Sequence, residues 1–140
     1  MNSKAKFCKV ILITLCLMLV SCGGVPLNKG NEWLESKKDR PEINISGTWV
    51  SPEWNIAFFK QQDKIIIGNI GDYPFKGVVS GNKVYLMMYR GEKADYFAEL
   101  EVVDKDTLKG HYSKYRTIDE VKNDPAFAIP MSLRCIQRNP

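Results

Sequence analysis

The chain has 140 residues, of which 44% are hydrophobic and 26% charged, and its formal net charge is +4. This length fits one compact domain, and the ordinary composition excludes a disordered, collagen-like or multi-span membrane chain. Most of the excess positive charge comes from Lys4, Lys6 and Lys9. Because nucleic-acid-binding proteins usually carry a concentrated basic surface, no nucleic-acid partner is expected.

Residues 1–21 have the organisation of a secretory signal peptide. A basic opening is followed by the apolar run VILITLCLMLV at residues 10–20. A membrane-spanning helix needs about 20 apolar residues, whereas the central region of a signal peptide has about 7–15. The run therefore predicts a signal peptide, with the small Ser21 at the cleavage position directly before Cys22.

The residues Leu19-Val20-Ser21-Cys22 resemble the lipobox of bacterial lipoproteins. This resemblance implies cleavage between Ser21 and Cys22, a diacylglyceryl group on the Cys22 thiol, and acylation of the new amino terminus by a fatty acid such as palmitate. Two or three acyl chains hold a protein stably on a membrane. Gly23 is not the Asp that retains members of this family at the inner membrane. The resemblance thus implies a lipid-anchored protein of the cell envelope, on the outer membrane facing the periplasm in a diderm host. The alternative is a plain signal peptide followed by an incidental cysteine.

The segment 22–43 is rich in Gly, Pro and charged residues and has no sustained periodicity. This composition predicts a flexible tether between the lipid anchor and a folded domain at residues 44–140. Random-coil scaling gives such a tether a span of about 25 Å. In the alternative, Trp33 and Leu34 form one helical turn or dock on the domain.

From residue 45 onward, short apolar runs alternate with Gly, Asn and Asp turns. A spacing of about 8–12 residues with short links predicts antiparallel hairpins and an all-β fold. About eight strands can close into a small up-and-down barrel, which removes the exposed edges of an open sheet. The expected strands are residues 47–51, 56–60, 64–70, 73–80, 83–89, 96–103, 107–114 and 129–137.

The alternation of apolar and polar residues predicts which face of each strand is buried. In 96–103 four apolar residues share one face and Glu99 and Glu101 lie on the other, as in a half-buried antiparallel strand. By the same rule His111 points to solvent. Residues 83–89 are apolar on both faces, which predicts either burial on both sides or an exposed apolar strip.

One short helix is expected before the last strand. Thr117 and Glu120 have the spacing of a capping box. Pro125 disfavours helical geometry in the residue before it. The prediction is a helix over residues 118–123.

Cysteine usage agrees with an envelope protein. Cys8 and Cys16 leave with the signal peptide and the lipid consumes Cys22, so Cys135 is the only cysteine left and no intramolecular disulfide can form. In an oxidising compartment a lone thiol is usually buried. Cys135 alternates with two apolar residues, which predicts a core-facing strand position.

Gly47-Thr48-Trp49 opens the first expected strand, and Arg134 lies in the last. This pairing resembles the signature of lipocalins and related calycin barrels, in which the Trp closes the barrel base and a basic side chain packs across the indole. The resemblance implies a barrel-closing pair of Trp49 and Arg134 and the binding of a small ligand. The domain is shorter than a typical lipocalin, and the other lipocalin motifs are not recognisable. Alternation also places Arg134 outward, so its contact with Trp49 must wrap over the rim.

The residues give no basis for catalysis. The single histidine has no cysteine or serine partner in a recognisable arrangement, His111 and Cys135 lie on different expected strands, and there is no Gly-rich phosphate loop. Glu99 and Glu101 are either paired carboxylates or, in the alternative, a solvated outer face. We therefore expect no enzyme activity, metal or cofactor.

Surplus aromatic and methionine residues indicate binding. Trp54, Met87 and Tyr89 are expected to be partly exposed and to form a binding surface. The first interpretation is a non-catalytic, lipid-anchored module that holds a small apolar ligand in the barrel or at its mouth. The alternative is a filled barrel that binds an envelope protein, as a hydrolase inhibitor or a subunit of an envelope assembly. An internal cavity favours the first, and a dry core with an apolar surface patch favours the second.

Overall fold

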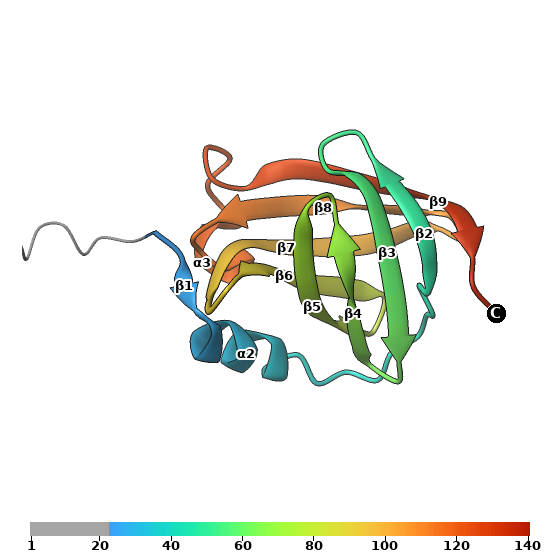
Figure 1. Cartoon of the computed structure of the whole chain (residues 1–140), viewed down its shortest axis with the longest axis horizontal. Helices are drawn as coiled ribbons and strands as arrows, with labels where there is room; N and C mark the ends of the chain where they lie inside the picture. The colour runs from blue at the N-terminus through green and yellow to red at the C-terminus, as the bar shows by residue number, and fades with distance from the viewer. Residues whose placement is uncertain (1–22) are drawn as a thin grey trace, which may run out of the picture.

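The computed structural model describes residues 23–140, and the predictions for the signal peptide and for Cys22 lie outside the described residues. The described chain forms a closed antiparallel β-barrel with a short helix before its last strand, as the turn spacing predicts (Figure 1). The barrel strands are β2 (Gly47–Ser51), β3 (Asn55–Gln62), β4 (Ile65–Ile70), β5 (Tyr73–Ser80), β6 (Lys83–Arg90), β7 (Lys93–Asp104), β8 (Thr107–Lys114) and β9 (Ile129–Arg138).

Strand β9 closes the barrel. Each strand from β2 to β8 pairs with the next along the chain, and β9 pairs with both β8 and β2. Between β7 and β8 the closure depends on Gly110, because a Cβ at this position would collide with the carbonyl oxygen of Glu99. Closure leaves none of these eight strands with an unpaired edge that could recruit another chain.

Side chains from all eight strands fill the barrel interior. An eight-stranded barrel is just wide enough for its inward side chains to fill it, and the rings of Phe59 and Phe75 meet there with centroids 5.0 Å apart. The buried residues of this cluster are at most 2% exposed. They are Ile45, Trp49, Ala57, Phe59, Ile66, Ile70, Phe75, Val79, Val84, Leu86, Met88, Ala98, Leu100, Leu108, Met131 and Leu133.

A second apolar cluster lies outside the barrel, under helix α2 (Leu27–Glu35). Trp33 and Leu34 of α2 are buried against the outward side chains of β6 and β7, including Met87 and Phe97. The prediction of a flexible tether is therefore wrong for this part of residues 22–43. The physical reason is the outward apolar face of β6, which needs a cover that the amphipathic α2 supplies.

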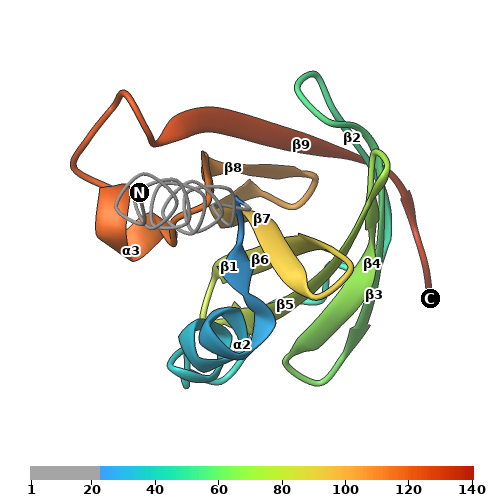
Figure 2. The ribbon, with the colours of Figure 1, turned by 60° about the vertical axis from the view of Figure 1, so that its left-hand side comes forward.

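The segment before α2 also belongs to the folded domain. Strand β1 (Val25–Pro26) pairs antiparallel with Ala94 and Lys93 of β7. Figure 2 shows β1 and α2 together on one side of the barrel, with β3 and β4 on the other. The folded unit thus begins about twenty residues before the expected domain boundary at residue 44.

Trp33 makes the contacts that hold α2 against the barrel. Its ring stands edge-on to Tyr85 and Phe97, with centroid distances of 5.7 and 5.3 Å, and its indole N–H donates to Oδ2 of Asp119 at 2.9 Å. The Lys37 ammonium donates to the same carboxylate oxygen at 2.6 Å. Asp119 belongs to helix α3 (Ile118–Val121), so one carboxylate ties the two helices together.

Helix α3 follows the sequence prediction closely. It has the predicted capping box of Thr117 and Glu120, and it ends two residues earlier than expected. Its Ile118 and Val121 are buried. Within residues 23–140, neither helix has the length and apolar character needed to span a bilayer.

Replacing Trp33 by Ala should destabilise the protein by about 3–5 kcal/mol, because the buried indole is lost and the apolar surface of Met87, Tyr85 and Phe97 is exposed. Urea unfolding measures this loss. Glu35→Ala on the exposed side of the same helix should change stability by less than about 0.5 kcal/mol. If the Trp33→Ala variant lost as little unfolding free energy as the Glu35→Ala variant, the packing of α2 would not contribute to the stability of the fold.

The docking of α2 should weaken in acid. Partial burial raises the pKa of the Asp119 carboxyl, but hydrogen bonds from Lys37 and Trp33 outweigh it and hold this pKa below the usual value for aspartate. A lowered pKa stabilises the folded state above the unfolded-state pKa of about 3.9 and loses that contribution as the pH falls through the folded value. Hydrogen exchange should show constant protection of α2 between about pH 5 and 7 and a loss below about pH 4.

Asp119→Asn is the control for this pH dependence, since it keeps an oxygen acceptor for Trp33 and removes the charge. Exchange from α2 should be faster than in the wild type near neutral pH. The difference should shrink as the pH falls below about pH 4 and vanish below the lowered pKa of Asp119. A difference that persists in strong acid would rule out the carboxylate as its source.

Candidate functional site

One end of the barrel is closed by Trp54, which follows β2. Its ring stands edge-on to Tyr73, Tyr96 and Tyr112, with centroid distances of 5.9, 4.8 and 5.1 Å. Trp54 is half-buried, and its buried indole N–H has no hydrogen-bond acceptor within residues 23–140. The expected binding residue Trp54 therefore plugs the barrel mouth with three tyrosines around it.

The opposite end is closed by Trp49, but its cationic partner is Arg138. The guanidinium carbon of Arg138 lies 5.0 Å from the Trp49 ring centroid, and the Trp49 indole N–H donates to the carbonyl of Ile45 at 2.9 Å. Arg138 also donates hydrogen bonds to the carbonyl oxygens of Asn44 and Lys105. These contacts connect the end of β9 to the segment directly before β2 and to the turn between β7 and β8.

The predicted pair of Trp49 and Arg134 is therefore wrong in its second member. Arg134 is exposed and lies opposite Val50 on the outer face. A bulge in the pairing of β2 with β9, next to Trp49, shifts the register of the final residues. The side-chain period of two excludes Arg134 from the Trp49 ring, and the shifted end of β9 brings Arg138 there instead.

The other two predicted binding residues, Met87 and Tyr89, lie in different parts of the barrel surface. Met87 is 2% exposed, because α2 covers it, so its assignment to an exposed surface is wrong. Tyr89 is half-buried and lines an outer hollow together with Phe58 and Ile67. Cys135 is partly buried and packs against the barrel core, on the side that its alternation predicts.

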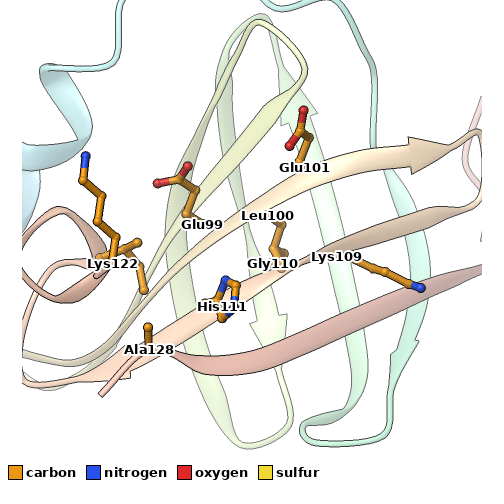
Figure 3. A pocket seen from close by; sticks show the side chains of 9 residues that line it. Glu99, Leu100, Glu101, Lys109, Gly110, His111, Lys122 and Ala128 are labelled. Atoms are coloured by element: carbon orange, nitrogen blue, oxygen red, sulfur yellow. The ribbon is translucent and has the colours of Figure 1, made fainter. Parts of the chain in front are cut away.

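A hollow of about 400 Å³ lies outside β7 and β8, beside α3 (Figure 3). Glu99 faces His111 and Glu101 faces Lys109 across the two strands. His111 is exposed, as predicted. In Figure 3 the Lys109 side chain points away from Glu99 and His111.

Both carboxylates of this hollow already have partners. Glu99 accepts a hydrogen bond from the Lys83 ammonium at 2.9 Å, and Glu101 accepts one from the Asn82 side chain at 3.0 Å. The hydrogen bond and the charge of Glu99 raise the pKa of Lys83 above its usual value. Within residues 23–140, no three His, Cys, Asp or Glu side chains are grouped to hold a metal. The arrangement is a solvent-facing set of charged and polar side chains whose carboxylates are already hydrogen-bonded.

An exposed apolar surface lies on two neighbouring strands at the other side of the barrel. It consists of Ile56 and Phe58 on β3 and Ile65 and Ile67 on β4, and we call it the β3–β4 face. These side chains are 39–53% exposed, with Phe58 the most exposed. Lys60 pairs with Ile67 in register, which places Phe58 diagonal to Ile67 and within contact range for long side chains. Contiguous exposed apolar residues of this kind mark interaction sites.

Cations flank the β3–β4 face in the same cross-strand rows. Ile67 lies between Lys60 of β3 and Lys76 of β5. Among the described strands, Asp and Glu occur only in β7, on the opposite side of the barrel. The carboxylates nearest in sequence, Glu53, Asp63 and Asp72, lie in the turns at the ends of β3 and β4. The face is therefore apolar with a basic border along its strands.

Sequence reasoning missed the β3–β4 face, although the alternation contained a signal for it. Ile56 and Phe58 alternate with buried Ala57 and Phe59, so β3 is apolar on both faces. The prediction drawn from such a two-sided pattern concerned only β6, where α2 covers the outer side. On β3 and β4 no helix of the described chain covers it.

Comparison of the chain with protein-family models, with curated proteins and with solved structures finds no match.

Arg138→Ala should destabilise the protein by about 1 kcal/mol, because the cation over the Trp49 ring and its hydrogen bonds to two carbonyls are lost. Urea unfolding gives the magnitude, and near-ultraviolet circular dichroism reports on the Trp49 environment. Arg134→Ala is the matched control on the same strand and should leave both unchanged. The reverse order of effects would restore Arg134 as the closing residue.

Proposed function

We propose that this chain is a lipid-anchored envelope protein whose filled barrel acts as a non-catalytic protein-interaction module, with the β3–β4 face as its docking surface. The observation that carries this proposal is the exposure of Phe58 and Ile67 on the outside of a barrel whose interior is packed with side chains. It follows the alternative interpretation of the sequence, with a different surface from the one expected.

The packed interior argues against the small-ligand interpretation. Buried side chains from every barrel strand meet inside, and Trp49 and Trp54 close the two ends. The hollow that contains Tyr89 and Phe58 lies on the outer surface. A small apolar ligand would have to displace this core, at the free-energy cost of breaking close packing. The eight-stranded architecture remains similar to that of calycin barrels, without the open interior that ligand binding requires.

The chemistry of the face defines its partner. A protein surface that buries Phe58 and Ile67 must be apolar at its centre and carry carboxylates opposite Lys60 and Lys76. A second copy of this chain docked through the same face would bring these cations close together, and like charges at an interface disfavour the pairing. The proposed partner is therefore a different envelope protein with an acidic border around an apolar surface.

A photo-crosslinking amino acid at position 58 in the native host should capture one defined partner. The same amino acid at position 103 should not, because Val103 is equally exposed, at 57%, but lies on β7. With the purified partner, Phe58→Ser should weaken binding about 30-fold, or about 2 kcal/mol, as expected for a central aromatic residue of an interface. Val103→Ser should leave the affinity unchanged.

Three outcomes would contradict the proposed function. Equal crosslinking from positions 58 and 103 would mean that the β3–β4 face is not special. Crosslinking of the chain only to itself would assign the face to a homodimer. A stoichiometric small molecule in the native mass spectrum of the mature protein would return the assignment to the ligand-binding interpretation.

A further inference from the structure

The lipid anchor and the barrel are separated by very few residues. We infer that the mature protein lies directly on the bilayer, with the β1 side of the barrel against the lipid headgroups and the β3–β4 face turned away from them. This inference rests on the proposed lipidation of Cys22, and it adds the orientation of the domain and the surface that contacts the lipid.

The pairing of β1 sets the distance. Only Gly23 and Gly24 lie between Cys22 and β1, whose Val25 pairs with Ala94 of β7. A fully extended chain spans about 3.3–3.6 Å per residue, so a lipid attached at position 22 can lie no more than about 11 Å from Val25 in β1. The span of about 25 Å expected for a tether is not available, because the residues that would supply it form β1 and α2.

The end of the described chain lies on an aromatic and basic surface. A side chain at Gly23 would touch the ring of Tyr115, which is 42% exposed. The Lys114 ammonium lies over the same ring at 4.9 Å, and the Arg116 guanidinium lies over the ring of Phe127 at the same distance. We call these four residues the Tyr115–Phe127 edge. Aromatic rings with cationic heads suit the headgroup boundary, where one end of a side chain is apolar and the other is hydrated.

A hollow of about 560 Å³ beside this edge is lined by residues from β1, from α2 and from the segment that leads to α3, including Val25, Lys29 and Arg116. Glu32 and Glu120 also line it. Glu120 is engaged by the backbone N–H of Thr117 at 2.8 Å. The hollow thus contains the two cations Lys29 and Arg116 and the two carboxylates Glu32 and Glu120. This balance of charge fits a layer of mixed lipid headgroups and does not fit a single bound anion.

The barrel geometry places the β3–β4 face on the far side. Strand β7 carries β1, and four strand spacings separate β7 from β3 along the closed sheet. At about 4.8 Å per spacing this is roughly 19 Å along the sheet, more than the two glycines can bridge. Figures 1 and 2 both show β1 and α3 at one side and β3 with β4 at the other. An anchor at Cys22 therefore leaves Phe58 and Ile67 facing the aqueous compartment.

The test uses the full lipidated protein in vesicles of phosphatidylethanolamine and phosphatidylglycerol. A spin label is attached to Phe127→Cys, Ile67→Cys or Val103→Cys in a Cys135→Ser background, and its accessibility to a water-soluble nickel chelate is measured before and after reconstitution. Phe127, Ile67 and Val103 are all exposed in the structure. The accessibility of the label at position 127 should fall several-fold on reconstitution. The labels at position 67 and at position 103, which lies at the other end of β7 from Ala94, should not change.

The mass of the N-terminal peptide separates the possible failures. If Cys22 carries the lipid and the label at 127 stays fully accessible, or the label at 67 is shielded equally, the inferred orientation is wrong while the proposed anchor stands. If the peptide carries no lipid, the anchor and this inference fail together. A lipidated peptide with shielding confined to position 127 supports both.

Discussion

Closure of the sheet through β9 is the constraint on which the rest of this structure depends. Because β9 pairs with both β8 and β2, the sheet has no free edge in its eight strands and a fixed, small interior. Alternate residues of every strand fill that interior, and Trp49 and Trp54 close its ends. A barrel that has no room inside must interact through its outer surface, so closure directs the proposed function to side chains that point outward.

The outer surface of the barrel has two apolar regions, one covered by a helix and one exposed. On β6 and β7, helix α2 covers Met87 and Phe97 and is held by the contacts of Trp33 with Asp119. On β3 and β4, Phe58 and Ile67 keep about half of their surface exposed. In the covered region, the apolar side chains of α2 pack on those of β6 and β7, and a few hydrogen bonds form at the border of this contact. The barrel surface can therefore bind an amphipathic element. The β3–β4 face has the same apolar character and a border of lysines in place of a helix.

Charge and attachment point give the barrel two sides. The strand carboxylates are confined to β7, where Glu99 and Glu101 are paired with Lys83 and Asn82. Strand β1 binds to β7 as well, so the proposed anchor and the acidic strand lie on one side and the basic, apolar β3–β4 face on the other. The proposed lipid attachment and the proposed partner surface therefore do not compete for the same part of the barrel.

By itself the sequence determined what local patterns can encode: the eight barrel strands to within a few residues, the closed antiparallel fold, the capped helix α3 and the exposed His111. Strand alternation and turn residues act over a few positions, which is why they could be read from the chain alone. Only the tertiary structure decided that α2 packs on the barrel, that Arg138 and not Arg134 covers Trp49, and that Met87 is buried while Phe58 is not. Each of these depends on a contact between residues far apart in sequence or on a bulge that shifts register, and a local pattern holds no information about which outer face another element will cover.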